Sequence, residues 1–174
     1  MPNNRTSIAL GCCFFAMTVS AWAQSRKTGL WELTTVQTWQ QSPFPPGAAG
    51  AAPGGDANSS SAGGTYTKLV CLTQQEIDKY GAIVPRTRGC QVTNVVKKSG
   101  GMTADWVCTG AISGKGTMES HMVDSDHAKG TLHFVGTLQA RPNAKPIEWT
   151  TQSSSVFKSA DCGDVKPVPL PDDK

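Results

Sequence analysis

Six side chains that could bind a metal ion or exchange protons gather in one short stretch of the sequence. They are Glu119, His121, Asp124, Asp126, His127 and His133. Imidazole and carboxylate groups are common metal ligands. If the stretch forms a β-hairpin, His121 lies nearly opposite His133 on the outer face and His127 lies at the tip. Ligands on one open surface lack the surrounding groups that orient a metal site. We therefore interpret the stretch as a polar hairpin end, with these histidines as the only metal candidates, and expect no bound metal.

No catalytic motif is complete in this chain. None of the serines lies in Gly-x-Ser-x-Gly, and His-Glu-x-x-His does not occur. The segment Gly114-Lys115-Gly116-Thr117 shares a glycine and a lysine with phosphate-binding loops, but Thr109 stands where such a loop has its first glycine. The acidic pairs at 124/126 and 172/173 fall at a turn or in the tail, where burial does not adjust carboxyl pKa values. The sequence thus predicts no enzymatic activity and no cofactor.

Four of the six cysteines are expected in the mature protein, because Cys12 and Cys13 fall within an N-terminal export signal. The four are Cys71, Cys90, Cys108 and Cys162. An even number of cysteines in an exported chain predicts disulfides. No two of them have the close spacing of a structural zinc site.

The segment from Cys90 to Cys108 predicts a β-hairpin with one cysteine on each arm. Thr, Val and Trp fill the arms, and the turn-forming residues Ser99-Gly100-Gly101 stand at the centre. Folding about this turn places three pairs opposite each other on one face. These pairs are Cys90 with Cys108, Val92 with Trp106, and Asn94 with Ala104. The two hairpin cysteines are therefore expected to bridge, which leaves Cys71 to pair with Cys162 by elimination.

Residues 1–23 predict a secretory signal. Arg5 supplies the positive charge, an apolar run extends from Ile8 to Val19, and Ala21-Trp22-Ala23 forms the cleavage site. The apolar run of about 12 residues is too short to span a bilayer, which takes about 20. We expect a periplasmic or secreted protein without a membrane span, cleaved after Ala23. A lipoprotein site at Leu10-Gly11-Cys12 is the alternative.

The rest of the chain predicts a single mainly β domain over residues 24–162. β-branched and aromatic residues concentrate in about seven segments. These span 28–39, 65–70, the two arms of 90–108, 114–123, 130–138 and 147–157. Thr73-Gln74-Gln75-Glu76 is a capping box that predicts a short helix to Tyr80, ended by Gly81. Serial hairpins favour an antiparallel meander that forms a curled sheet or a small barrel, with a two-sheet sandwich as the alternative.

Two segments fall outside this β pattern. Residues 40–64 are rich in Pro, Gly, Ala and Ser, which predicts a disordered insertion. Residues 163–174 form a Pro-rich tail that cannot pair in a sheet. The formal net charge is +3, or +2 once Arg5 is removed with the signal. Basic pairs such as Lys97-Lys98 have no interleaved aromatic residues, so no nucleic-acid partner is expected.

Large apolar side chains alternate with polar ones along the predicted strands, so one face of each strand is buried. In the first strand we expect this face to carry Trp31 and Leu33. The inward residues are candidates for packed core or for the wall of an apolar cavity. They are Trp31, Trp106, Trp149, Met118, Met122 and Phe134. Core and cavity wall use the same residue types, so both interpretations stay open.

Several short motifs together resemble the bacterial exported family catalogued as domain of unknown function 3617, DUF3617. They are Lys27-Thr28-Gly29-Leu30-Trp31-Glu32, Cys71-Leu72-Thr73, Cys90, Val107-Cys108-Thr109-Gly110, Gly114, Gly116 and Asp161-Cys162. The resemblance covers about Lys27 to Cys162. It implies a β-rich cell-envelope protein of Gram-negative bacteria, with no established activity and no catalytic residues to transfer. The insertion before Thr65 and the tail after Cys162 depart from the family pattern.

A non-catalytic module of the cell envelope that binds a small ligand is the function that fits these features best. The curled sheet would hold a small apolar ligand among its inward Trp, Met and Phe residues. One alternative is a protein that acts through its surface, as an interaction protein or an inhibitor in the envelope. Another is an enzyme, which would need an acid–base pair assembled from distant strands.

Overall fold

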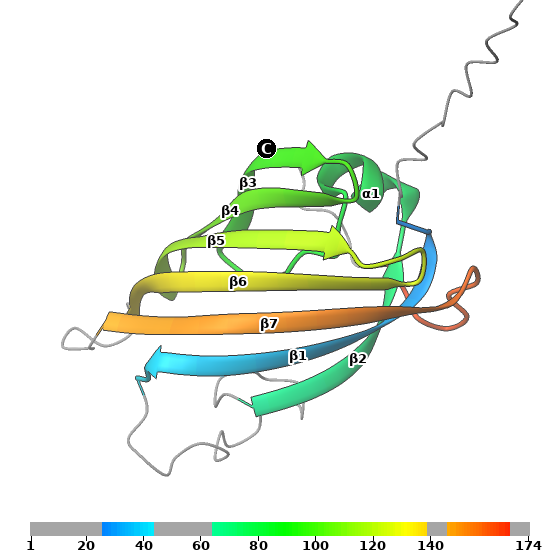
Figure 1. The fold of residues 1–174 in the computed structure, drawn as a ribbon. Helices are drawn as coiled ribbons and strands as arrows, with labels where there is room; N and C mark the ends of the chain where they lie inside the picture. The colour runs from blue at the N-terminus through cyan, green and yellow to red at the C-terminus, as the bar shows by residue number, and fades with distance from the viewer. Residues whose placement is uncertain (1–25, 44–63, 139–145, 168–174) are drawn as a thin grey trace, which may run out of the picture.

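The computed structural model describes residues 26–43, 64–138 and 146–167. Seven antiparallel strands form one sheet, accompanied by one short helix (Figure 1). The strands are β1 (Gly29–Gln41), β2 (Gly64–Leu72), β3 (Cys90–Lys98), β4 (Gly101–Thr109), β5 (Ile112–Met122), β6 (His127–Leu138) and β7 (Pro146–Ser159), and the helix is α1 (Gln74–Tyr80). The predicted mainly β fold with a single short helix is confirmed.

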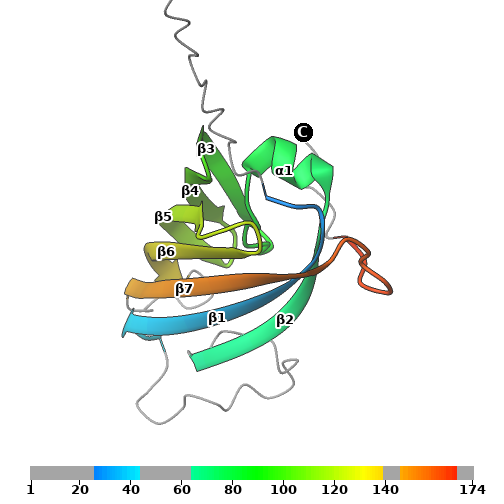
Figure 2. The same ribbon diagram turned by 45° about the vertical axis from the view of Figure 1, so that its right-hand side comes forward.

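The sheet curls but does not close. Its strand order is β2-β1-β7-β6-β5-β4-β3, so β3 to β7 form a meander and β7 returns to pair with β1. The two edge strands are β2 and β3, and α1 lies in the connection between them. Figure 2 shows the curl, with α1 near one end of the strands. Of the predicted alternatives, the curled sheet is therefore the one that forms.

Alternation of side chains gives the sheet a buried inner face. On β1, Trp31 is fully buried and Thr35 and Gln37 are buried on the same side, whereas Val36 between them is 40% exposed. Leu33 shares this inner face and is half-buried. The predicted orientation of the first strand is confirmed.

The β3–β4 hairpin contains a bulge that the sequence pattern does not reveal. Beside the turn Lys98 pairs with Gly101, whereas at the far end Cys90 pairs with Cys108. These two registers differ by one residue, because the turn alone would place Cys90 one position further along β4. The extra residue is absorbed near Asn94, which has a φ of 52°. A bulge of this kind sets two residues of one strand against one of its partner.

The bulge decides which predicted pairs of the hairpin form. Val92 pairs with Trp106, as predicted. The predicted pairing of Asn94 with Ala104 is wrong, because the bulge takes Asn94 out of the ladder. Its side chain instead donates a hydrogen bond to the Asp105 carboxylate at 2.7 Å.

Helix α1 begins and ends as its capping residues predict. The Thr73 hydroxyl accepts the Glu76 N–H at 3.2 Å, and the Glu76 carboxylate accepts the Thr73 N–H at 3.2 Å. Gly81 ends the helix with a φ of 72°, a left-handed conformation that favours glycine. Arg86 donates to the buried Glu76 carboxylate at 3.1 Å. This ion pair holds the loop after α1 against the first turn of the helix.

Both predicted disulfides are present. Cys90 bridges Cys108 across the hairpin. Cys71, near the end of edge strand β2, bridges Cys162, which follows β7. The second bridge therefore ties one edge of the sheet to the C-terminal end of the domain.

Several predictions concern residues outside the described ranges. The export signal at 1–23 with cleavage after Ala23 lies there, as do most of the insertion and the end of the tail. The predicted insertion of residues 40–64 is too long at both ends, because β1 runs to Gln41 and β2 begins at Gly64. Residues 163–167 of the tail form no strand. Among the described residues, no helix has the length and apolar character needed to cross a membrane.

We expect the Cys71–Cys162 disulfide to contribute more stability than the Cys90–Cys108 disulfide. The bridged residues are separated by 91 and by 18 positions. Closing such loops in the unfolded chain is worth about 4.5 and about 3 kcal/mol respectively. Urea denaturation of C71A/C162A and of C90A/C108A measures the two losses. A larger loss of unfolding free energy for C90A/C108A would contradict the expected order of the two disulfides.

Candidate ligand-binding site

One end of the inner face is a packed aromatic cluster. The ring centroid of Phe134 lies 4.3 Å from that of Trp149 and 5.2 Å from that of Trp106. Trp39 extends the cluster at 5.1 Å from Trp149. Trp106, Phe134 and Trp149 are 4%, 0% and 6% exposed, and Tyr80 at the end of α1 belongs to the same core. These rings contact one another and form core.

The remaining inward candidates lie on the same face at different places. Met118 belongs to the same core as the aromatic cluster. Trp31 lies toward the other end of β1, where it packs edge-on against Phe157 with centroids 5.5 Å apart. Met122, at the end of β5, is half-buried. The structure therefore gathers Trp106, Phe134 and Trp149 and keeps Trp31 apart from them.

A band of small polar residues crosses the inner face between Trp31 and the aromatic cluster. Neighbouring strands β1, β7, β6 and β5 contribute one residue each, in direct register. They are Thr35, Ser153, Gly130 and Ser120. Thr35 and Ser120 are buried, as is Ser155 beside them on β7. Small side chains here leave room for a group that comes from outside the sheet.

The side chain of Arg26 lies against this band. The residue is 6% exposed, and its guanidinium lies 5.3 Å from the centroid of the Trp31 ring. Nη2 donates a hydrogen bond to Ser120 Oγ at 3.2 Å, whereas the buried Nε has no hydrogen-bond partner. Burial lowers the pKa of Arg26 to about 10, because water no longer solvates the charge. The side chain is still a cation at neutral pH.

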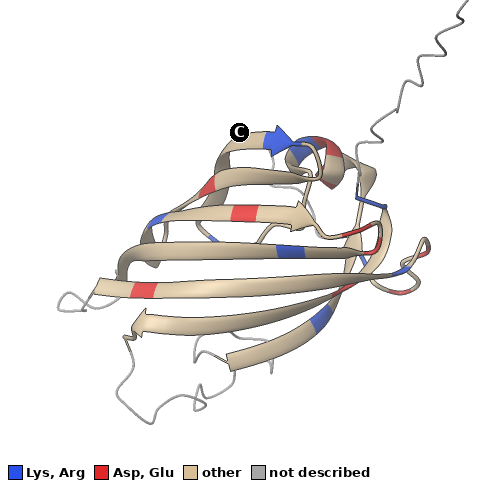
Figure 3. Cartoon of the chain, viewed as in Figure 1, with Lys and Arg blue, Asp and Glu red and all other residues tan. Residues whose placement is uncertain are grey.

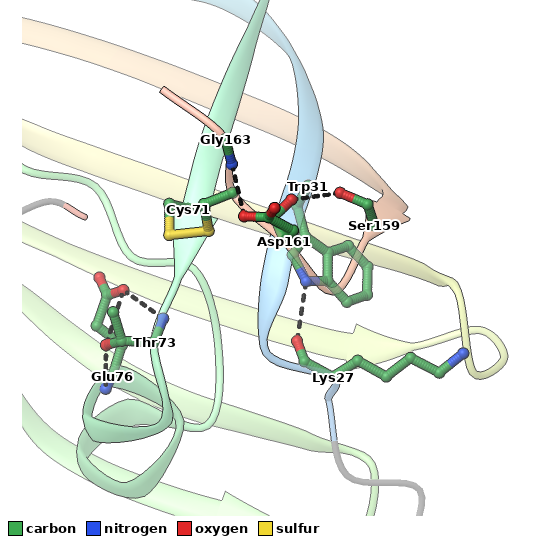
Figure 4. The surroundings of a disulfide bond; sticks show 9 residues. Lys27, Trp31, Cys71, Thr73, Glu76, Ser159, Asp161 and Gly163 are labelled. Atoms are coloured by element: carbon green, nitrogen blue, oxygen red, sulfur yellow. Dashed lines mark hydrogen bonds between the residues drawn. A yellow bond between two sulfur atoms is a disulfide. The ribbon is translucent and has the colours of Figure 1, made fainter. Parts of the chain in front are cut away.

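The residues around Arg26 explain how the chain places it inside. The indole Nε1 of Trp31 donates to the backbone oxygen of Lys27 at 2.9 Å (Figure 4). The ammonium of Lys27 lies 2.6 Å from the Asp126 carboxylate at the β5–β6 turn. These two contacts anchor the segment before β1, with Lys27 directed outward and Arg26 inward. The burial of Arg26 is not predicted from the sequence, because no local pattern distinguishes it from an exposed arginine before a strand.

The acidic residues of the sheet lie on its outer face. Each described strand carboxylate is adjacent in sequence to a buried inward residue and so points the other way. They are Glu32, Asp105, Glu119 and Glu148. Figure 3 shows how sparsely charged residues are distributed over the strands. Within the described ranges, no carboxylate forms an ion pair with Arg26.

The predicted register of the histidine hairpin is wrong. Its turn is tighter than predicted, because β6 already begins at His127 and Met122 pairs with Ala128. His121 therefore pairs with Lys129 and not with His133.

Each of the other two histidines has its own carboxylate partner. His133 Nε2 lies 2.9 Å from Glu148, and His127 Nδ1 lies 2.8 Å from Asp124. The pKa of Asp124 is lowered, first because its carboxylate accepts the backbone N–H of Asp126 and then because it bonds the His127 ring. In the part of the chain that the structure describes, no three His, Cys, Asp or Glu residues come together as metal ligands.

Two hollows open on the outer face of the sheet. One, of about 310 Å³, is lined by residues that include Asn94, Thr117 and His133. The other, of about 400 Å³, is lined by residues that include Val36 and His121. Both have Thr-rich walls and lie on the opposite side of the sheet from Arg26.

A family model described as Protein of unknown function (DUF3617) matches residues 26–162. This match covers most of the chain. The chain belongs to the DUF3617 family. The resemblance noted from the sequence motifs is thereby confirmed. The DUF3617 match begins at Arg26 and ends at Cys162, so it contains the polar band and both disulfides. No curated protein and no solved structure matches the chain.

Replacing Arg26 by Met in this DUF3617 domain should raise the free energy of unfolding at pH 7 by about 1–2 kcal/mol. A buried charge without a counter-ion costs free energy that an apolar side chain of similar length avoids. Urea denaturation measures the change. The variant Lys158→Met is the control, since loss of its exposed ion pair with Glu32 changes stability by less than about 1 kcal/mol. A loss of stability in Arg26→Met would show that the guanidinium holds the fold together.

The stability difference between wild type and Arg26→Met should narrow above pH 10. Burial in the folded protein lowers the pKa of Arg26 from its ordinary value to about 10. Between these values the unfolded chain binds more protons than the folded one, so the wild type gains stability as pH rises. Arg26→Met lacks this gain. Denaturation at pH 8 and pH 10.5 compares the two proteins, and a constant difference would contradict the assigned cause of the shift.

Proposed function

We propose that this DUF3617 protein is an exported, non-catalytic module that binds a small ligand on the inner face of its curled sheet. The observation that carries the proposal is the polar band beside Arg26. Buried polar groups in protein cores are normally paired with one another. Here a buried cation lies beside hydroxyl groups, and no carboxylate of the described residues pairs with it, which supports a recognition role for the band.

The proposed site lies beside the aromatic cluster and not within it. The sequence predicts an apolar ligand among the inward tryptophans, but Trp106 and Trp149 pack against Phe134 and against one another. The cluster thus supports the site as a rigid neighbour. The adjacent band has smaller side chains and a charge, so it is better suited to hold a ligand.

The edge strand β2 offers a route to the band. Tyr66 pairs with Thr35 and Lys68 pairs with Leu33, so both β2 residues share the inner face. Lys68 is exposed, and Leu33 and Tyr66 are half-buried. The inner face is therefore less covered toward β2 than at the aromatic cluster. A small molecule would approach from this side.

The proposed module is exported and non-catalytic. Two disulfides support an exported location, since such bonds persist in oxidising compartments such as the periplasm. The predicted signal with cleavage after Ala23 would deliver the chain there. The band offers hydroxyl groups, with the guanidinium of Arg26 beside them, and neither group exchanges protons readily near pH 7. This composition favours binding over acid–base catalysis.

A second candidate function uses the outer face. The two Thr-rich hollows lie on this side, and Glu119 borders both of them. They favour a protein that acts on a partner through its surface. An envelope interaction protein or an inhibitor of an exported enzyme would use the sheet in this way.

Native mass spectrometry of the protein purified from its exported compartment tests the proposal. We expect a native mass that exceeds the denatured mass by a discrete small-molecule increment. Thr35→Leu should abolish the increment, because a larger apolar side chain fills the band. Thr34→Leu is the matched control on the outer face and should retain it. Thermal denaturation confirms that both variants fold.

Other results of this measurement would favour other functions. A bare native mass for folded wild-type protein argues against the ligand-binding module. An increment that survives Thr35→Leu but is lost in Thr34→Leu would place the ligand on the outer face. A doubled mass without an increment would favour the surface-acting protein.

A further inference from the structure

The fold treats Arg86 and Arg26 in different ways. Arg86 forms an ion pair with the buried carboxylate of Glu76 at 3.1 Å. Arg26 is buried more deeply than the partly exposed Arg86, but its neighbours are the Trp31 ring and the hydroxyl of Ser120. Removing a charge from water is costly unless an opposite charge or several hydrogen bonds replace the water. Arg26 has one hydrogen bond and one ring contact, so its environment is incomplete.

The hydrogen bonds that Arg26 does not make define what is missing. A guanidinium carries five N–H donors and no acceptor. Nη2 donates to Ser120 at 3.2 Å, and the buried Nε donates to no group. Because the oxygen of Ser120 accepts this bond, its own hydroxyl hydrogen remains available as a donor. The site thus offers several donors and lacks a charged acceptor.

The protein supplies no such acceptor from the sheet. The carboxylates of the described strands point outward, and the charged residues on the inner face of the sheet are Lys68 and Lys97, both cations. Lys97 donates to the backbone oxygen of Asp78 in α1. Among the described residues, the charges on the inner face of the sheet are therefore all positive, and none of them supplies a negative group to Arg26.

We propose that Arg26 binds the oxyanion of a small amphiphilic ligand, either a carboxylate or a phosphate ester. This inference rests on the proposed function, because it assigns a ligand chemistry to the same site. A guanidinium holds such a group with two parallel N–H···O bonds. Ser120 is placed to donate a further hydrogen bond. The incoming charge supplies the counter-ion that Arg26 lacks.

The residues beside Arg26 would contact the apolar part of the ligand. Trp31 lies under the guanidinium, and Leu33 follows it on the inner face with a half-buried side chain. The partly exposed side chain of Leu33 would contact a short hydrocarbon chain. Lys68, directly opposite Leu33 on the edge strand, is an exposed cation that would attract the anion toward the band.

Calorimetric titration of the full mature protein, freed of bound material, tests the assignment. The probes are decanoate, decyl phosphate, inorganic phosphate, decanol and decyltrimethylammonium. We expect the two amphiphilic anions to bind and decyltrimethylammonium not to bind. Binding of inorganic phosphate as tightly as decyl phosphate would identify a site for free oxyanions without a hydrocarbon chain.

Variants of Arg26 test separately whether ligand binding needs the positive charge of the side chain or its planar guanidinium. Arg26→Gln should weaken decanoate binding by about 30-fold or more, since truncating one partner of a buried charge pair costs several kcal/mol. Arg26→Lys should retain part of the affinity, because it keeps the charge but loses the planar fork. Lys158→Gln removes an exposed cation on the outer face, so it is the matched control and should bind like the wild type. Circular dichroism confirms that each variant folds.

The possible outcomes distinguish failure of the inferred ligand chemistry from failure of the proposed ligand-binding function. Equal decanoate affinity in wild type and folded Arg26→Gln overturns the inference, as does a failure of both anions to bind. A native ligand that proves neutral or cationic overturns the inference and leaves the binding module intact. A bare native mass together with no response to any probe overturns both.

Discussion

The burial of aromatic rings on the inner face of an open sheet is the constraint on which the rest of the structure depends. The sheet has two edge strands, β2 and β3, that do not pair with each other, so closure into a barrel does not stabilise it. The packing of Trp106, Phe134 and Trp149 stabilises it instead. Gly116 allows this packing, because it pairs with Phe134 and a Cβ there would come within 2.7 Å of the His133 backbone oxygen. The helix and the loop after it then cover the cluster, and the disulfides fix an edge strand and the β3–β4 hairpin.

This arrangement divides the inner face into an aromatic cluster and a polar band, which are stabilised by different interactions. At the aromatic cluster, area removed from water stabilises the fold, and large side chains leave little room. Across the polar band, Thr35, Ser153, Gly130 and Ser120 contribute little apolar area. Stability there must come from hydrogen bonds, and Arg26 makes fewer of them than it has donors. The stability gained at the aromatic cluster therefore offsets the cost of burying Arg26 at the polar band, which is a common relation between a core and a binding site.

The sequence predicted the elements that depend on short-range pattern. Alternation and turn residues predicted the seven strands, and the capping box together with Gly81 predicted α1. The disulfide of Cys90 with Cys108 was predicted from a symmetric turn, although the real hairpin reaches that pairing only through the bulge near Asn94. The register of His121 was predicted wrongly, because the length of a polar turn is weakly encoded and one shift in the turn moves every pair beyond it.

The candidate site was predicted only in part, and the reason is physical. Inward tryptophans follow from period-two alternation, but alternation does not say whether rings fill a space or line it. Arg26 precedes the first strand, so no period assigns it to a face, and its burial follows from contacts between residues far apart in sequence. The Lys27 ammonium reaches Asp126, and the Arg26 guanidinium reaches Ser120. A functional group that is held by long-range contacts, in a position where local preference favours exposure, is the kind of feature that sequence rules miss and that a binding site requires.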